Sequence, residues 1–245
     1  MTPKKTSEQE RKDTILEIVV DQYIQTVTPV SSGFIAQEFH LDLSPATIRN
    51  ILVDLEEEGY LMHPHTSAGR MPTEQGYRYY VDNLMHEINL LEEEKERIRQ
   101  EYYKEVKDLE TLLDQASQVL SDVTQYTTII SVDGWGSKIF CRGTSHVISY
   151  PDINDLSKIK SIIRTLEEKE RIVEVINRNI EERVKIFIGQ ESACEEMDHC
   201  SLVISRYQVP QGLSGRIAVL GPTCMNYERV VSALDYFSDL MKTVK

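Results

Sequence analysis

The chain has 245 residues, 40% of them hydrophobic, so it is long enough for one large domain or two smaller ones with real cores. The net charge is −13, and residues 1–82 carry seven Lys or Arg against thirteen Asp or Glu, which argues against nucleic-acid binding by overall charge. Because the sequence lacks both a run of about eighteen apolar residues and an apolar signal core, we expect a cytoplasmic protein without a membrane span.

Two helices are predicted before residue 40. Residues 10–27 place apolar side chains at helical spacing, and Pro29 ends this helix. Ser31 is suited to cap the next helix, with Val30 and Ile35 as its hydrophobic staple. The apolar face of this second helix is predicted to comprise Phe34, Ile35 and Phe39.

The third predicted helix is the most informative element of the chain. Ser44 is a good N-cap, and Pro45 falls at the first helical position, where its missing N–H costs nothing. Gly59 ends the helix. Its buried stripe is predicted to comprise Ile48, Leu52 and Leu55. The helix start carries four polar residues away from that stripe, Ser44, Thr47, Arg49 and Asn50.

A β-hairpin is predicted to follow. Residues 60–65 favour an extended strand, residues 67–69 a turn, and residues 70–72 a returning strand. Thr73 can cap a fourth helix. The hairpin tip offers His65, Thr66, Ser67 and Arg70. Three helices followed by a hairpin are the order of a winged helix-turn-helix, whose third helix and hairpin tip both meet a nucleic-acid duplex.

The charge of this predicted domain is unevenly distributed along its third helix. Arg49 and Asn50 lie near the helix start, whereas Asp54 and the acidic residues 56–58 lie at the far end. The contact face can therefore be neutral to basic on an acidic body, with weak non-specific binding.

Residues 83–124 form a charged helical stretch with apolar residues at coiled-coil spacing and a very polar middle. Two interpretations stay open, namely a solvated linker helix and a coiled-coil arm that pairs two copies of the chain. The apolar seam comprises Leu84, Ile88, Leu91, Ile98, Leu109, Leu112 and Val119.

Residues 125–245 change to a pattern of short strands and helices. Strands are predicted over 127–132, 147–150, 184–188, 202–209 and 216–220, and helices over 156–166, 170–180 and 225–244. This order favours helices packed on a small, mostly antiparallel sheet, so the whole chain is predicted to be α+β and multidomain. The last helix carries an apolar stripe of Val230, Leu234, Phe237 and Met241.

Catalytic, cofactor and metal chemistry have little support in the sequence. Cys141, Cys194, Cys200 and Cys224 form no CxxC pair, and no phosphate-binding glycine motif occurs. Asp198, His199 and Cys200 are adjacent residues before a strand, which cannot easily assemble a nucleophile and base. We expect reduced thiols, no cofactor, no metal site and no enzyme activity.

The first 82 residues contain three distinctive blocks, SPATIRN (44–50), DLEEEGYL (54–61) and PHTSAGRMPTEQGYRYYVD (64–82). These blocks resemble the HrcA family of bacterial heat-inducible transcription repressors. CSLVISRYQV (200–209) and GRIAVLGPTCMNYERVVSALDY (215–236) are similar to the family's C-terminal end. The resemblance implies a winged-helix DNA-binding domain over 1–82, a helical linker over 83–124 and a GAF-like domain over 125–245. Only some twenty residues separate Thr124 from Ser145, where the family carries more, so we expect a shortened member with a reduced sheet.

The resemblance also implies function and partners. It implies a repressor of chaperone genes that binds, as a homodimer, the double-stranded inverted-repeat operator called CIRCE and whose activity depends on the GroEL chaperonin. Candidate DNA-binding residues are Ser44, Thr47, Arg49, Asn50, His65, Thr66, Ser67 and Arg70. An alternative is a ligand-sensing regulator without chaperonin coupling. An enzyme built on the C-terminal half is a further alternative, which requires Cys194 or Cys200 to face His199 or His146 in a cleft.

Overall fold

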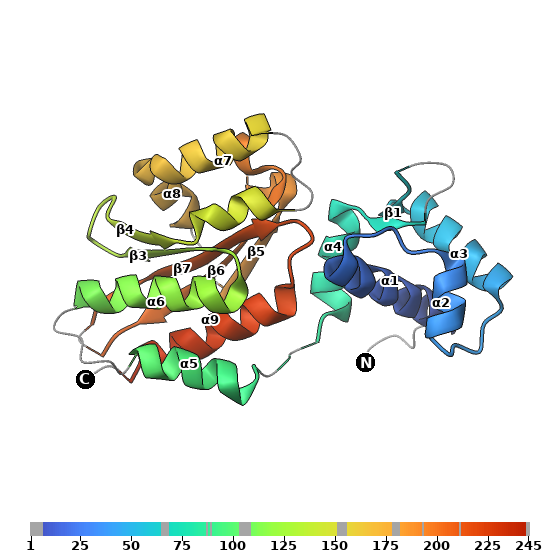
Figure 1. The fold of residues 1–245 in the computed structure, drawn as a ribbon, viewed down its shortest axis with the longest axis horizontal. Coiled ribbons are helices and arrows are strands. Elements are labelled where there is room, and N and C mark those ends of the chain that lie inside the picture. Colours follow the sequence, from blue (N-terminus) through green and yellow to red (C-terminus); the bar gives the residue numbers. More distant parts are fainter. Residues whose placement is uncertain are drawn as a thin grey trace. The chain divides into compact units, whose positions relative to one another are not determined.

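A computed structural model describes residues 7–64, 69–86, 88, 90–102, 109–150, 156–177, 182–192, 194–210 and 212–243. The chain divides into two compact units, Met1–His86 and Glu87–Lys245 (Figure 1). Both combine helices and strands, which confirms the predicted α+β class. None of the helices in these ranges has the length and apolar character that crossing a bilayer requires.

The first unit has the predicted order of helices and strands. Its elements are α1 (Ser7–Thr26), α2 (Ser32–Glu38), α3 (Pro45–Glu57), β1 (Leu61–Met62), β2 (Met71–Pro72) and α4 (Glu74–Tyr79), followed by a π-helical turn over Tyr80–Leu84. β1 and β2 are antiparallel, with Leu61 opposite Pro72. Each strand has only two residues, fewer than the extended segments that the sequence predicts.

The three predicted N-caps are confirmed. In each, a side-chain oxygen accepts the backbone N–H three residues later, which satisfies a donor that the helix itself leaves unpaired. Ser31 accepts from Phe34 at 3.1 Å, Ser44 from Thr47 at 3.1 Å and Thr73 from Gly76 at 3.0 Å. Gly59 follows the end of α3 with a φ of +83°, a conformation that glycine adopts without strain.

The core of the first unit is formed by α1 and the elements that pack on it. Fully buried side chains include Ile15, Leu16, Ile35, Ile48, Leu55 and Leu61. The Tyr79 hydroxyl donates to Asp13 at 2.8 Å, and the Tyr80 hydroxyl donates to Asp21 at 2.9 Å, which holds the segment after β2 against α1. The interpretation of Phe34 as a buried residue of α2 is wrong. This helix of seven residues buries only Ile35, and Phe34 instead packs edge-to-face on Phe39.

The second unit is built on one five-stranded sheet. Its strands are β3 (Thr127–Val132), β4 (Ile139–Arg142), β5 (Val184–Ile188), β6 (Cys200–Gln208) and β7 (Ser214–Pro222). They lie in the order β4-β3-β7-β6-β5, and every neighbouring pair is antiparallel, as the sequence predicts.

Helices cover both faces of the sheet (Figure 1). They are α5 (Glu92–Tyr102), α6 (Leu109–Thr124), α7 (Leu156–Glu167), α8 (Lys169–Ile176) and α9 (Tyr227–Met241). One face buries Ile129, Leu202 and Ala218 against α7 and α8. On the other face, the hydroxyls of Ser201 and Tyr227 lie 2.7 Å apart and tie β6 to α9. The predicted stripe of α9 is buried here, with Val230, Leu234, Phe237 and Met241 all at 1% exposure or less.

One local prediction in this unit is wrong, and one strand was missed. Residues 147–150 are not a strand, because Thr144–Ser149 forms a 3-10 helix that turns Val147 into the core. Tyr150 follows it, and its hydroxyl donates to the carbonyl of Leu220 at 2.6 Å. Conversely, β4 was not predicted. It has four residues and, among the described strands, pairs only with β3, so its alternation of side chains is too short to predict a strand.

Leu84, the first residue of the expected coiled-coil seam, is buried in the first unit, and the rest of the segment from residue 87 onward belongs to the second unit. This part of the segment forms the separate helices α5 and α6, which pack with α9 and the sheet. Ile98, Leu112 and Val119 of the expected seam are buried in this unit, whereas Ile88 and Leu91 are exposed. The apolar spacing therefore serves the fold of the unit itself, because the sheet offers α6 a face to cover.

Candidate nucleic-acid interface

Helix α3 has two opposite faces. Ile48, Ile51, Leu52 and Leu55 are buried, and the first unit packs around them. On the opposite side an exposed stripe, which we define as Ala46, Arg49, Asn50 and Val53, follows the three- and four-residue spacing of one helix face. The predicted burial of Ile48, Leu52 and Leu55 is thus confirmed.

The predicted polar residues at the start of α3 differ in what they contact. The hydroxyls of Ser44 and Thr47 lie 2.9 Å apart, and Ser44 also caps the helix. Arg49 and Asn50 are exposed, and neither side chain forms an ion pair or hydrogen bond with another residue that the structure describes. Arg49 and Asn50 therefore have free donors, and Asn50 also a free acceptor, as contacts to base edges require.

The acidic end of α3 is largely paired with cations from other elements. Lys12 of α1 reaches Glu58 at 2.7 Å and Asp54 at 3.8 Å. The hydrogen bond to Glu58 raises the pKa of Lys12 above its ordinary value. Glu56 contacts both His63 and Arg70. These ion pairs reduce the negative field at the far end of the helix. A count of charges along the sequence does not reveal this reduction.

Arg70 is held by both its backbone and its side chain. Its N–H and C=O exchange hydrogen bonds of 2.8 Å with Val30, just before α2. Its Nη2 lies 2.7 Å from Oε2 of Glu56, and the side chain is 20% exposed. Gly69 permits this approach, because a Cβ there would lie 2.4 Å from the carbonyl of Val30. Arg70 thus links the returning strand to the end of α3.

The predicted site residues fall into three groups. Ser44, Thr47, Arg49 and Asn50 lie together at the start of α3, whereas Arg70 faces Glu56 at the other end. His65, Thr66 and Ser67 lie outside the described residues. Sequence reasoning missed Ala46 and Val53 of the exposed stripe, although their spacing from Arg49 and Asn50 was a signal that could have found them.

Cys194 and Cys200 are buried in the second unit. Burial raises the pKa of the Cys200 thiol to about 12, so the thiol is protonated at neutral pH. The Cys194 thiol donates to Glu196 at 3.4 Å, and His199 Nε2 lies 3.4 Å from Oδ1 of Asp198. Within the described ranges, no group of three or more His, Cys, Asp or Glu side chains is placed to hold a metal ion.

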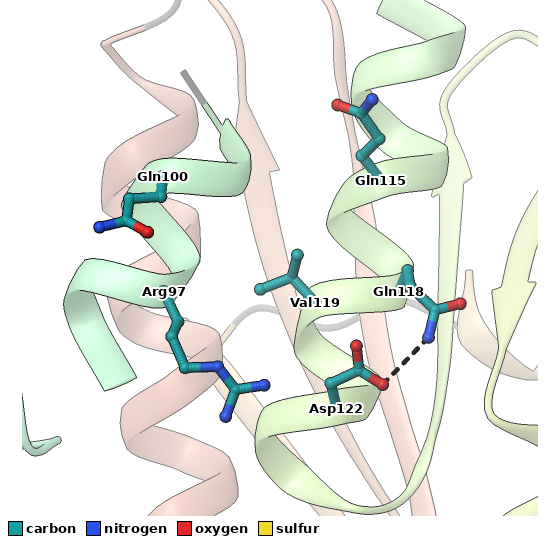
Figure 2. Close-up of a pocket in the computed structure, with 6 residues that line it drawn as sticks. All are labelled: Arg97, Gln100, Gln115, Gln118, Val119 and Asp122. Carbon is teal, nitrogen blue, oxygen red and sulfur yellow. Dashed lines mark hydrogen bonds between the residues drawn. The ribbon is translucent and has the colours of Figure 1, made fainter. Parts of the chain in front are cut away.

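A hollow of about 270 Å³ lies between α5 and α6 (Figure 2). It is lined by Arg97, Gln100, Gln115, Gln118, Val119 and Asp122. Gln118 donates to Asp122 at 3.0 Å, so part of the polar lining is satisfied internally. The hollow lacks the mostly apolar lining that is typical of small-molecule sites, and it identifies no ligand.

Comparison with known proteins shows which proteins this chain is similar to. The family model described as the HrcA protein C-terminal domain matches residues 131–231. The heat-inducible transcription repressor HrcA of Symbiobacterium thermophilum is 28% identical, over 92% of this chain and 95% of its own length. The same-named protein of Clostridioides difficile is 29% identical, over 95% of this chain and 98% of its own length. The chain is thus similar to HrcA proteins over nearly its whole length.

Two further comparisons concern length and fold. The alignment with the Symbiobacterium protein spans 325 positions, so at least 80 of them lie opposite gaps in this chain of 245 residues. This confirms that the chain is shorter than that relative. A crystal structure of a hypothetical protein has a TM-score of 0.75 at 16% identity and covers 97% of this chain and 98% of its own. That protein shares the fold.

Proposed function

We propose that this protein is a cytoplasmic, sequence-specific DNA-binding repressor of heat-shock genes in the HrcA family, without enzyme activity. The observation that carries the proposal is the exposed stripe of α3, where Arg49 and Asn50 project opposite a fully buried face. A helix with polar, unpaired side chains on its outer face and a hairpin after it suits the major groove of B-DNA. The names of the relatives support the repressor role.

The two compact units suggest a division of labour. Residues 1–82 act as the winged helix-turn-helix domain. The compact unit that supports this assignment runs to His86, and its π-helical turn buries Tyr80 and Leu84. The second unit acts as a GAF-like regulatory domain, and its antiparallel sheet covered by helices on both faces supports this assignment.

The operator and the partners follow from the family resemblance. We infer that the protein binds the CIRCE inverted repeat as a homodimer, because an inverted repeat presents two equivalent half-sites related by two-fold symmetry. One acidic unit should be attracted only weakly to DNA phosphates, and binding by two copies compensates for this weak attraction. GroEL is the inferred partner that keeps the repressor active.

A gel-shift assay with the full chain tests this function. The wild-type protein is titrated with a duplex that carries CIRCE and with a duplex of the same composition in scrambled order, with and without GroEL, at two temperatures. We expect preferential binding to CIRCE, strengthened by GroEL and weakened at the higher temperature. Equal binding to the two duplexes contradicts a CIRCE repressor.

The same assay separates a second candidate, a ligand-sensing regulator without chaperonin coupling. One observation favours this candidate, since the chain lacks at least 80 positions that the aligned relative contains. Operator binding that GroEL leaves unchanged at both temperatures supports this alternative.

A further inference from the structure

Val53 lies at the C-terminal end of the exposed stripe of α3. It is 37% exposed, four residues after Arg49 and three after Asn50. Residues at these spacings are neighbours on one helix face, so the three side chains project together. The buried residues Ile51, Leu52 and Leu55 occupy the opposite side of the helix.

Val53 is not among the buried core residues of α3. Its β-branched side chain loses rotamer freedom in a helix and has a lower helix propensity than alanine or leucine. The residue is also not part of the charged end of α3, because Asp54 turns toward Lys12 and Glu56 toward Arg70. Ala46, one turn before Asn50, adds a second small apolar side chain to the stripe.

The stripe therefore presents apolar groups on either side of a polar pair. In the major groove, thymine alone displays a methyl group, and small apolar side chains are the groups that contact it. Hydrogen-bonding residues read the neighbouring base edges. The chemistry of the stripe matches a base sequence in which thymine adjoins the bases that Arg49 and Asn50 contact.

We propose that Val53 is a specificity-determining residue that packs against the C5-methyl group of a thymine in each half-site of the operator. This proposal rests on the proposed function, because it requires α3 to enter the major groove. Because Val53 is uncharged, its contribution to the preference for the operator sequence should not depend on salt concentration.

Removal of single thymine methyl groups from the DNA tests the proposal. The full chain is titrated with CIRCE duplexes in which one thymine at a time, at equivalent positions of the two half-sites, is replaced by deoxyuridine. The proteins are wild type, Val53→Ala and the control Leu156→Ala, which truncates a residue 70% exposed in the second unit. At one position we expect deoxyuridine to weaken wild-type binding about fourfold for each half-site. This is the effect of losing the burial of one group of the size of a methylene.

The variants then decide the assignment. Val53→Ala should bind the thymine and deoxyuridine duplexes equally at that position, and Leu156→Ala should discriminate as wild type does. Wild-type indifference to every deoxyuridine, or full discrimination by Val53→Ala, overturns the role of Val53 while CIRCE binding itself stands. Equal wild-type binding to CIRCE and scrambled DNA overturns the proposed function and the role of Val53 together. Because Val53 is exposed, circular dichroism of Val53→Ala should match wild type.

Discussion

Arg70 and Glu56 join the returning strand of the hairpin to the far end of α3, with 2.7 Å between Nη2 and Oε2. Both side chains are largely shielded from solvent, and His63 approaches the other oxygen of the same carboxylate. The pair gives Arg70 a role in orienting the hairpin. Arg70 was predicted from its sequence position to reach DNA, and that contact stays a prediction.

A double-mutant cycle distinguishes these two roles of Arg70. We expect Arg70→Ala and Glu56→Ala each to lower the free energy of unfolding, with a coupling of about 1 kcal/mol, because the pair is only partly exposed. The measurement is urea unfolding by circular dichroism, compared with fluorescence of Trp135, the single tryptophan, which reports the second unit. A coupling near zero, together with a salt dependence of DNA binding reduced by about one counterion in Arg70→Ala, assigns Arg70 to phosphate instead.

Arg49→Ala should remove base discrimination without unfolding the protein. Arg49 is exposed and has no ion-pair partner among the described residues, so its loss leaves no buried group unpaired. An arginine that reads guanine is worth about 1–3 kcal/mol of discrimination. Competition of CIRCE against scrambled duplex measures this effect. Arg11→Ala, which removes the same charge from an exposed position of α1, is the matched control and should retain discrimination. A variant Arg49→Ala that discriminates like wild type removes Arg49 from the interface.

Leu112→Ala should destabilise the second unit without dissociating a dimer. Leu112 is 5% exposed within this unit, and truncation of a buried leucine costs about 2–5 kcal/mol. Unfolding followed by Trp135 fluorescence measures the loss of stability, and light scattering measures the mass under native conditions. Leu91→Ala, at an exposed position of the same apolar spacing, serves as the control. A halved mass for Leu112→Ala with unchanged stability restores the coiled-coil interpretation.

The buried thiol of Cys200 predicts a loss of stability at high pH. Its pKa is raised from the ordinary value of 9.0 to about 12 in the folded protein, because burial disfavours the thiolate. Ionisation is therefore easier in the unfolded chain. The stabilising contribution of the neutral thiol is fully present below pH 9 and is lost as the pH rises toward 12. Burial likewise raises the pKa of Tyr150 and Tyr207 and acts in the same direction.

Thiol labelling checks this prediction directly. At neutral pH, pulsed alkylation followed by peptide mass analysis should label the partly exposed Cys141 before Cys200. Labelling of Cys200 should rise only with unfolding, by denaturant or above about pH 9. Rapid modification of Cys200 in the folded protein at neutral pH contradicts its burial.

Much of the first unit was determined by the sequence alone, because its signals are local. The caps at Ser31, Ser44 and Thr73 each involve a backbone N–H three residues later, so they are visible in a short stretch of sequence. The buried stripe of α3 follows from helical periodicity in the same way. Arg49 and Asn50 were found as exposed polar residues by the same reasoning.

Only the tertiary structure decided which distant residues meet. Lys12 and Glu58 are 46 positions apart, and no local pattern predicts that α1 neutralises the end of α3. The apolar spacing in 84–119 suits a coiled coil and a sheet-covering helix equally, so the choice depended on the face that β3 and β4 offer to α6. Arg70 shows the same limit, since an arginine near a hairpin tip suits both DNA and a carboxylate, and the position of Glu56 was set by the packing of α3.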